Sequence, residues 1–317
     1  MLAVPASTPA QAPLVLLATC SLLPDGEEWT GTDHLLPALR ARGLDPRWAV
    51  WDDTSVNWSA GLVAVRSTWD YEGRREEFLA WAGSLPWMLN SAETFAWNTD
   101  KAYLPELAAH VSVVPTVLVE DEPDLPCAIA DVSPGEDPAA VVKPRVGAGG
   151  RGVVVFDGAD SSGTAPGSGT DESALGPGPW VVQPLVESVR TEGETSVFVI
   201  DGEVVSQARK VPAAGEIRVH EQYGGRTVAV PVSEEAADLA RRTVAAAGEL
   251  LGRPLDYARV DQMRLADGSL AVSELEVTEP GLYLDVIPDN AAAFAALVAD
   301  RVARGPGADV QPGSTPR

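Results

Sequence analysis

Short apolar runs and amphipathic stretches alternate along the first hundred residues, in the pattern of an α/β protein. The runs over residues 14–19 and 62–66 predict buried strands, because continuous apolar runs of this length are typical of strands covered on both faces. Residues 34–42 and 76–83 carry apolar positions at helical spacing, which predicts helices. We expect this part of the chain to form a first α/β domain over residues 13–100.

Beyond residue 100 the pattern changes to short strands joined by turn residues. It predicts strands over residues 139–143, 153–156, 180–183, 195–200 and 204–209. Asp201-Gly202 joins the last two as a hairpin turn, which places Glu194 opposite Arg209. Residues 233–251 are predicted to form an amphipathic helix with Ser233 as its N-cap.

Three segments show no periodic pattern of apolar residues. Residues 1–12 and 305–317 are expected to be flexible tails. Residues 158–179 are rich in Gly, Ser, Pro and Asp, which favours a mobile insertion at the surface.

The formal net charge of −23 limits the classes of partner. Nucleic acids and anionic membranes are bound through basic surfaces, so this charge argues against both. No apolar stretch approaches the roughly 20 residues of a membrane-spanning helix. The first basic residue is Arg40, so the N-terminal apolar run lacks the charge of a secretory signal. Cys20 and Cys127 have no partner motif, which argues against disulfides or a zinc site and favours a reducing, cytoplasmic location.

Only three of the 23 basic residues are lysines, namely Lys101, Lys143 and Lys210. In a chain that otherwise uses arginine, a retained lysine indicates that a compact ammonium is needed, as it is at phosphate groups. The alternative is chance retention on the surface.

Two alternating strands flank Asp267-Gly268, which predicts a β-hairpin with a two-residue turn. In this register Asp261 lies opposite Glu274 and Arg259 lies opposite Glu276, with all four on one face. Opposed carboxylates repel each other, and a divalent cation between them removes that repulsion. Oxygen donors without His or Cys suit Mg²⁺, so the hairpin predicts a magnesium site. The alternative is an acidic face exposed to water.

Lys143 ends a predicted strand that continues into the glycine-rich segment 146–152. Glycines let backbone N–H groups approach phosphate oxygens closely, and the lysine adds positive charge. The spacing matches neither a Walker A motif nor a Rossmann fingerprint. A glycine-rich hairpin tip without a ligand is the alternative.

These features occur in the order typical of the ATP-grasp superfamily. The chain resembles the bacterial branch that includes O-ureido-D-serine cyclo-ligases and glutathione-synthetase-like ligases. The motifs that carry the resemblance are Arg66-Ser-Thr-Trp-Asp-Tyr71, Trp97-Asn-Thr-Asp-Lys101, Val142-Lys143-Pro144, Gln183-Pro184, Gly193-Glu-Thr-Ser196, Arg218-Val219, Gly224-Gly225, Tyr257-Ala-Arg-Val-Asp261, Glu274-Leu-Glu276 and Glu279-Pro280.

The resemblance implies an α/β ATP-grasp fold in which two lobes, residues 101–186 and 187–304, clasp ATP beside the first domain. Phosphate contacts are implied for Lys101, Lys143, Gly149 and Gly150. A hinge that meets the adenine is implied for Gln183, Pro184, Leu185 and Val186, with either Glu187 or Glu194 near the ribose. Magnesium ligands, with Mn²⁺ as an alternative ion, are implied at Asp261, Glu274 and Glu276, although many relatives have Asn at the last position. Catalytic contacts are implied for Arg259, Arg218 and Lys210, and a border of the acceptor pocket for Arg66, Ser67, Thr68, Trp69, Asp70 and Tyr71.

The implied activity is ATP-dependent formation of an amide or a ring-closing C–N bond through an acyl phosphate, with release of ADP and phosphate. The substrates are expected to be a small carboxylate and an amine, amino-acid-like and belonging to natural-product biosynthesis. The chain differs from the family at Arg145–Gly152 and at Ala213-Ala214, and both segments are expected to touch substrate. A kinase or carboxylase on the same fold and a nucleotide-binding module without chemistry are the alternatives. The oligomeric state is left open, with the homodimer common among relatives.

Overall fold

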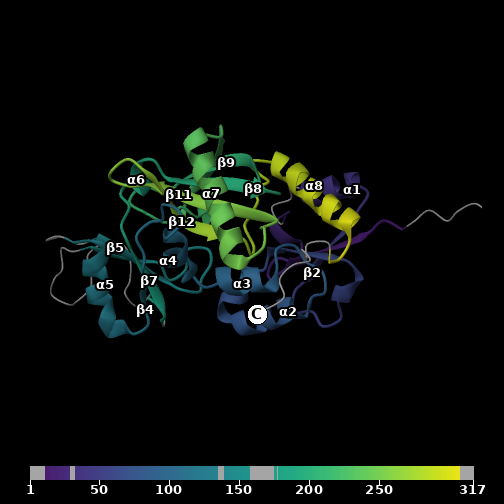
Figure 1. Cartoon of the computed structure of the whole chain (residues 1–317), viewed down its shortest axis with the longest axis horizontal. Helices are drawn as coiled ribbons and strands as arrows, with labels where there is room; N and C mark the ends of the chain where they lie inside the picture. The colour runs from purple at the N-terminus through teal and green to yellow at the C-terminus, as the bar shows by residue number, and fades with distance from the viewer. Residues whose placement is uncertain (1–10, 29–32, 135–138, 158–174, 177, 308–317) are drawn as a thin grey trace, which may run out of the picture.

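The computed structural model describes residues 11–28, 33–134, 139–157, 175–176 and 178–307, which are organised around three β-sheets (Figure 1). The expected tails and most of the expected insertion over residues 158–179 lie outside the described residues. No described helix combines the length and apolarity needed to cross a membrane. Cys20 is buried, Cys127 is exposed, and both are free.

The first sheet has three parallel strands in the order β2-β1-β3. Its elements are β1 (Leu14–Thr19), α1 (Leu35–Ala41), β2 (Asp45–Val50), β3 (Leu62–Ser67), α2 (Arg75–Ser84) and α3 (Ala92–Asn98). The strands and helices expected here from the apolar pattern are confirmed, whereas β2 and α3 were not predicted. Phe78 is fully buried and lies 5.6 Å from Trp51 and 5.5 Å from Trp81 between ring centroids, so aromatic rings fill one side of this sheet.

The second sheet is antiparallel in the order β4-β7-β5-β6. Its elements are β4 (Val117–Val119), α5 (Leu125–Val132), β5 (Ala139–Pro144), β6 (Val154–Asp157) and β7 (Trp180–Pro184). Helix α4 (Tyr103–Ala108) precedes them and packs in the core of the third sheet. Leu125 and Ala128 of α5 pack against Val142 and Val182, so this small sheet has its own apolar layer.

The third sheet has five antiparallel strands in the order β10-β9-β8-β11-β12. Its elements are α6 (Ser188–Thr191), β8 (Glu194–Ile200), β9 (Glu203–Val211), β10 (Arg226–Val230), α7 (Glu234–Leu251), β11 (Tyr257–Arg264) and β12 (Leu270–Glu276). Helix α7 starts at the predicted N-cap, where the Ser233 side chain accepts from the Ala236 N–H. Its apolar side packs on Val197 and Val260, which leaves the opposite face of the sheet open to the other domains.

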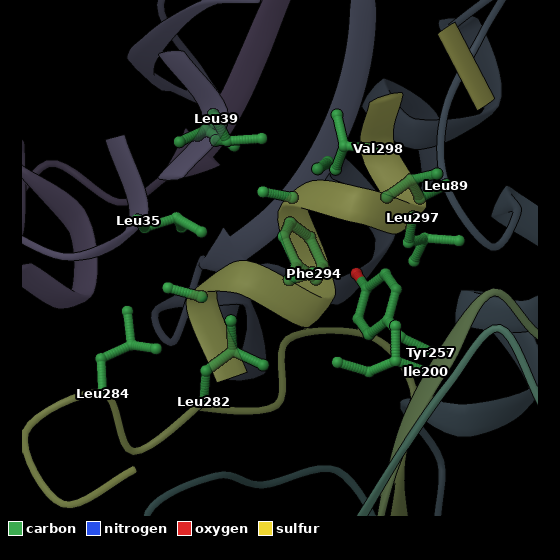
Figure 2. Packing of buried hydrophobic residues seen from close by; sticks show 14 of the residues in the cluster. Leu35, Leu39, Leu89, Ile200, Tyr257, Leu282, Leu284, Phe294, Leu297 and Val298 are labelled. Carbon is green, nitrogen blue, oxygen red and sulfur yellow. The ribbon is translucent and has the colours of Figure 1, made fainter. Parts of the chain in front are cut away.

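The last helix, α8 (Asp289–Arg304), packs against the first domain (Figure 2). Phe294 is fully buried in a cluster that contains Leu35 and Leu39 of α1 together with Tyr257 of the third sheet. The ring centroids of Phe294 and Tyr257 lie 5.4 Å apart. One apolar core therefore joins the first and third sheets, although the residues that form it are far apart in the sequence.

The β11–β12 hairpin has the predicted partners, but its turn differs from the prediction. Asp261 pairs with Glu274 and Arg259 pairs with Glu276, as expected. The turn contains three residues, because the Leu265 N–H donates to Ser269 (2.8 Å), and Gly268 at its end has φ +88°. The third turn residue shifts the register of the hairpin by one position. A β-bulge at Ser273 of β12, opposite Asp261 and Gln262, restores the predicted pairing.

The β8–β9 hairpin corrects a second prediction. Asp201 and Gly202 form the expected turn with positive φ angles of 51° and 79°. A bulge in β9 then changes the register, so that Glu194 faces Lys210 and not Arg209. A one-residue shift exchanges the two faces of a strand, which is why Lys210 and not its neighbour points at Glu194.

We expect Phe294→Ala to lower the free energy of unfolding by about 3–5 kcal/mol, because it leaves a cavity where two domains share one core. Urea denaturation followed by circular dichroism measures the loss. Leu22→Ala is the control, since Leu22 is 80% exposed and its removal should change stability by less than about 0.5 kcal/mol. Equal effects of the two substitutions would contradict a shared core at α8.

Candidate active site

A cavity of about 480 Å³ lies where the three sheets meet. The first domain contributes Trp69 and Tyr71 to its wall. The second sheet contributes Lys143 and Gln183, and the open face of the third sheet contributes Asp261 among others. Residues from all three parts of the chain therefore face one enclosed space, as expected of a site that brings two substrates together.

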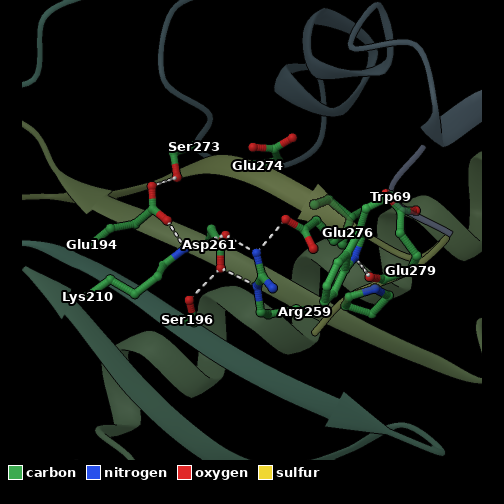
Figure 3. Close-up of polar contacts among 12 residues, drawn as sticks. Trp69, Glu194, Ser196, Lys210, Arg259, Asp261, Ser273, Glu274, Glu276 and Glu279 are labelled. Atoms are coloured by element: carbon green, nitrogen blue, oxygen red, sulfur yellow. Dashed lines mark hydrogen bonds and ion pairs between the residues drawn. The ribbon is translucent and has the colours of Figure 1, made fainter. Parts of the chain in front are cut away.

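Asp261 lies at the floor of the cavity and is surrounded by hydrogen-bond donors (Figure 3). Its Oδ1 accepts from Ser196 Oγ (2.7 Å) and Arg259 Nε (3.0 Å). Its Oδ2 accepts from Lys210 Nζ (2.8 Å) and Arg259 Nη2 (2.9 Å). Burial opposes ionisation of this carboxyl, but the two cations outweigh it and hold the pKa of Asp261 well below its usual range.

Lys210 bridges Asp261 to a second buried carboxylate, Glu194. Burial lowers the pKa of a lysine, yet these two carboxylates together raise the pKa of Lys210 well above its usual value. The hydroxyl of Ser273, the additional residue of the β12 bulge, donates to Glu194 Oε2 (3.3 Å). Removing one partner from such a buried pair typically lowers stability by about 3–5 kcal/mol, so the cluster holds strands β8, β9 and β11 in register.

Glu274 and Glu276 lie at the mouth of this cluster and each has one cationic partner. Lys101 Nζ lies 3.1 Å from Glu274 Oε1, and Arg259 Nη2 contacts Glu276 Oε1. Burial raises the pKa of Glu276 to about 7 although Arg259 opposes it, because Asp261 and Glu274 add repulsion. For Glu274 burial acts in the same direction, but Lys101 and Lys143 outweigh it and lower the pKa.

The three carboxylates of the predicted magnesium site differ in how accessible they are. Within the described residues, no three His, Cys, Asp or Glu side chains are grouped so that they could already hold a metal ion. Lys101, Lys210 and Arg259 contact these carboxylates in ion pairs. Glu274 and Glu276 fit a hard cation, since their side chains are 30% and 29% exposed and, among the described residues, their ion pairs use Oε1. Asp261 has both oxygens occupied, so it could bind an ion only by giving up a protein donor.

Two lysines and a glycine-rich turn form the wall beside these carboxylates. Lys101 Nζ donates to the carbonyl of Gly147 (2.8 Å), and Lys143 lies in the same wall. Burial, together with Lys101, lowers the pKa of Lys143, while Glu274 opposes the shift. Gly149 and Gly150 have φ angles of +64° and +71°, which L side chains rarely adopt, so the turn requires glycine there. Lys101 and Lys143 thus place positive charge in one wall of the cavity, as the expected phosphate contacts require.

Arg218 closes the cavity from the side of β10. Its guanidinium lies 3.7 Å from the ring centroid of Tyr223 and pairs with Glu216 (2.6 Å). Its Nε is buried without a hydrogen-bond partner. A Cβ on Gly150 would meet the Tyr223 ring at 3.2 Å, so Tyr223 packs directly against the glycine-rich turn. Arg218 thus retains a buried donor next to the segment expected to meet phosphates.

The predicted hinge lies along one edge of the cavity. Gln183, Pro184, Leu185 and Val186 all line it. The Leu185 N–H already donates to the Ala139 carbonyl (2.9 Å), so it is not free to contact a ligand. Of the two alternatives for the ribose, Glu194 lines the cavity, whereas Glu187 does not; its side chain is 70% exposed and pairs with Arg190.

Only part of the segment expected to border the acceptor pocket reaches the cavity. Trp69 and Tyr71 line it. The others, Arg66, Ser67, Thr68 and Asp70, do not line it. Arg66 is fully buried and donates to Glu27 Oε1 (2.7 Å) and to the Pro280 carbonyl (2.6 Å), so it joins two domains. The chain leaves β3 after Ser67 and turns into a short 3-10 helix that starts at Tyr71, so the six neighbours do not share one face.

The glycine-rich turn contacts the first domain through Glu72. Glu72 Oε2 accepts from the Ala148 N–H (3.0 Å), and Glu72 Oε1 pairs with Arg151. Arg151 Nη2 also donates to the Trp69 carbonyl (3.0 Å). The turn is therefore fastened to the first domain at the cavity wall. That residues 145–152 touch substrate stays a prediction.

Several cavity residues were not predicted from the sequence. Glu27, Glu279 and Tyr283 all line the cavity. The dipeptide Glu279-Pro280 was part of the family resemblance, but no role was assigned to it. Glu27 belongs to no sequence motif, so it is found only through its tertiary contacts, such as the ion pair with Arg66.

Two family models match this chain over most of its length. Residues 15–90 match the N-terminal domain of D-cycloserine synthetase DcsG, and residues 109–261 match the ATP-grasp domain of prokaryotic glutathione synthetase. The chain is 34% identical over 280 residues to the cycloserine biosynthesis protein DcsG of Streptomyces lavendulae, and the match covers 84% of this chain and 92% of that protein.

Solved structures agree with these matches. The crystal structure of D-cycloserine synthetase DcsG superimposes with a TM-score of 0.77 at 29% identity, covering 91% of this chain and 99% of that chain. D-alanine–D-alanine ligase from Bacillus anthracis shares the fold, with a TM-score of 0.62 at 13% identity over 92% of this chain and 98% of that chain. The expected ATP-grasp fold and the expected class of C–N bond-forming ligase are confirmed. The chain belongs to the ATP-grasp ligases, in the family of D-cycloserine synthetase DcsG.

Proposed function

We propose that this ATP-dependent ligase closes a ring within an amino-acid-like substrate, by joining its carboxylate to a nitrogen of the same molecule. The observation that carries the proposal is the first domain. It matches the N-terminal domain of DcsG, and it supplies Trp69 and Tyr71 to the cavity that also contains the cations and carboxylates. O-ureido-D-serine is the candidate substrate that this relationship favours.

ATP is proposed to bind between the second and third sheets. Lys101, Lys143 and the N–H groups near Gly149 and Gly150 supply positive charge for the phosphates. The adenine lies against the edge formed by residues 183–186. The Leu185 N–H already donates to Ala139 and the Val186 carbonyl already accepts from Val189, so the Leu185 carbonyl and the Val186 N–H are our candidates for its recognition. Glu194 is our choice over Glu187 for the ribose side, since it lines the cavity.

Glu274 and Glu276 are proposed to hold Mg²⁺, with Asp261 joining them if Lys210 or Arg259 moves aside. When bound, the ion neutralises phosphate charge and orients the triphosphate. Mn²⁺ would suit the same oxygen donors. Lys101 lies between Glu274 and the glycine-rich turn, so its ammonium links the carboxylate side of the site to the phosphate side.

In the proposed reaction a carboxylate oxygen of the substrate attacks the γ-phosphorus, and the bond to the departing ADP oxygen breaks. The substrate nitrogen then attacks the acyl carbon, loses its proton, and the phosphate leaves. Arg259 uses Nε and Nη2 in its ion pairs, and no described residue accepts a hydrogen bond from its Nη1. That group is our candidate donor to the negative charge that develops on the acyl oxygen.

Product analysis separates this proposal from a kinase, a carboxylase or a module without chemistry. Incubation with ATP, Mg²⁺ and O-ureido-D-serine should release ADP and phosphate and yield a cyclic product by mass spectrometry. A stable phosphorylated or carboxylated product, or the absence of ADP release, would contradict it. The use of ATP and the two free cysteines are compatible with the expected cytoplasmic location.

We expect Glu274→Gln to lower kcat by roughly a hundredfold or more and to raise the Mg²⁺ concentration needed for half-maximal activity, because a metal-binding charge is lost. ADP release across a Mg²⁺ titration measures both quantities. Glu249→Gln removes the same charge from the exposed side of α7 and should change neither. A Glu274→Gln protein with normal turnover and normal Mg²⁺ dependence would refute the ligand assignment.

We expect Glu72→Gln to increase ADP release relative to product severalfold, because the glycine-rich turn loses its fastening to the first domain and water reaches the activated substrate. Parallel assays of ADP and product give the ratio. Glu76→Gln, an exposed position on α2, is the matched control. An unchanged ratio would mean that Glu72 does not help to exclude water.

A further inference from the structure

One buried carboxylate in the cavity is not explained by nucleotide, metal or the ion cluster. Glu279 follows β12, lines the cavity and is 9% exposed. The hydroxyl of Tyr71 lies beside this carboxyl and lowers its pKa, against the effect of burial. No ion pair joins Glu279 to a Lys, Arg or His among the described residues. Glu221 and Asp285 also line the cavity without an ion pair, but both are exposed, so Glu279 is the buried acid without a cation among the described residues of the cavity.

Five other acids that line the cavity each contact at least one cation, and Lys210 and Arg259 are each shared by two of them. The pairs are Asp261 with Lys210 and Arg259, Glu194 with Lys210, Glu274 with Lys101, Glu276 with Arg259, and Glu27 with Arg66. A carboxylate buried without a cation is unfavourable, and proteins usually supply one or neutralise the group. Burial, with repulsion from Glu276, raises the pKa of Glu279 to about 8, in agreement with a missing positive partner.

The surroundings of Glu279 belong to the acceptor side of the cavity. Trp69 Nε1 donates to the Glu279 backbone carbonyl (3.2 Å), which holds the segment after β12 against the first domain. Tyr71 stacks on Phe78, with ring centroids 5.2 Å apart, so its hydroxyl is held in place. Gly281 lies next, where an added Cβ would meet the rings of Tyr283 and Trp69 at 3.7–3.9 Å. Aromatic side chains thus frame a single carboxyl group, and a cation bound beside it would favour its ionised form.

We propose that Glu279, held by Tyr71, binds the α-ammonium of the amino-acid substrate. This inference rests on the proposed function and names the group by which the substrate is recognised. An α-amino acid carries its ammonium on the carbon next to its carboxylate, so both groups fit one end of the cavity. The carboxylate is activated beside Arg259 and Glu276, and the ammonium supplies the cation that Glu279 lacks. Glu279 thereby selects amino acids over simple carboxylic acids.

Steady-state kinetics with O-ureido-D-serine test the assignment. Glu279→Gln is expected to raise KM by on the order of ten- to a hundredfold, the effect of losing a charged hydrogen bond, with kcat changed less than about threefold. Tyr71→Phe keeps the ring and should raise KM by a smaller factor. Glu249→Gln is the charge-matched control, and thermal unfolding checks that every variant is folded. A substrate analogue with hydrogen in place of the α-ammonium should be used equally well by wild type and Glu279→Gln.

The outcomes separate this inference from the proposed function. A wild-type enzyme that turns over O-ureido-D-serine while Glu279→Gln keeps its KM would overturn the ammonium assignment and leave the ligase reaction standing. A fall in kcat at unchanged KM would also overturn the ammonium assignment, since it indicates a chemical role for Glu279. Absence of ADP release by wild type with O-ureido-D-serine would overturn both the ammonium assignment and the proposed ligase reaction. If Glu279→Gln unfolds, the KM of Tyr71→Phe tests the ammonium assignment in its place. Loss of the hydroxyl should raise the KM for O-ureido-D-serine and leave the KM for the analogue without the ammonium unchanged; an unchanged KM for both would overturn the assignment.

Discussion

The site depends on one buried carboxylate held between two cations. Asp261 accepts four hydrogen bonds, from Ser196, Lys210 and twice from Arg259, and these residues come from strands β8, β9 and β11. A charge buried in this way is stable only when its partners are in place, so the cluster restricts the register of the three strands. It also sets the direction in which Arg259 and Lys210 face the cavity. The remaining carboxylates are arranged around this fixed centre.

Two β-bulges make that arrangement geometrically feasible. In β12 the bulge reverses the offset that the three-residue turn introduces, and it turns Ser273 toward Glu194. In β9 a bulge brings Lys210, and not Arg209, to the cavity face. Because side chains alternate along a strand, each bulge decides which residue points inward. The same chain without bulges would bury a different set of charges.

The cavity is closed by contacts between distant parts of the chain. Helix α8 shares a core with α1 and the first sheet, and this core holds the first domain against the third sheet. Arg66 joins Glu27 to the Pro280 carbonyl, and Glu72 fastens the glycine-rich turn. An ATP-grasp ligase must keep water from an activated carboxylate, and these contacts supply the walls that do so. They also leave Glu279 with Tyr71 as its neighbour on the acceptor side.

Many of the strands and helices and the opposed pairs Asp261–Glu274 and Arg259–Glu276 could be predicted from the sequence, because apolar periodicity and turn residues are local signals. Elements such as β2, α3 and α8 were missed, and the family was inferred from a resemblance of motifs. The motif at residues 66–71 was only partly informative, since the contact of Arg66 with the Pro280 carbonyl depends on a segment more than two hundred residues away. The pairing of Glu194 with Lys210 could not be predicted, because a bulge leaves no local mark. Tertiary structure alone decided that Lys101, Lys210 and Arg259 contact the central carboxylates and that, among the described residues, no cation pairs with Glu279. Ion pairs between distant strands are set by packing and not by spacing along the sequence.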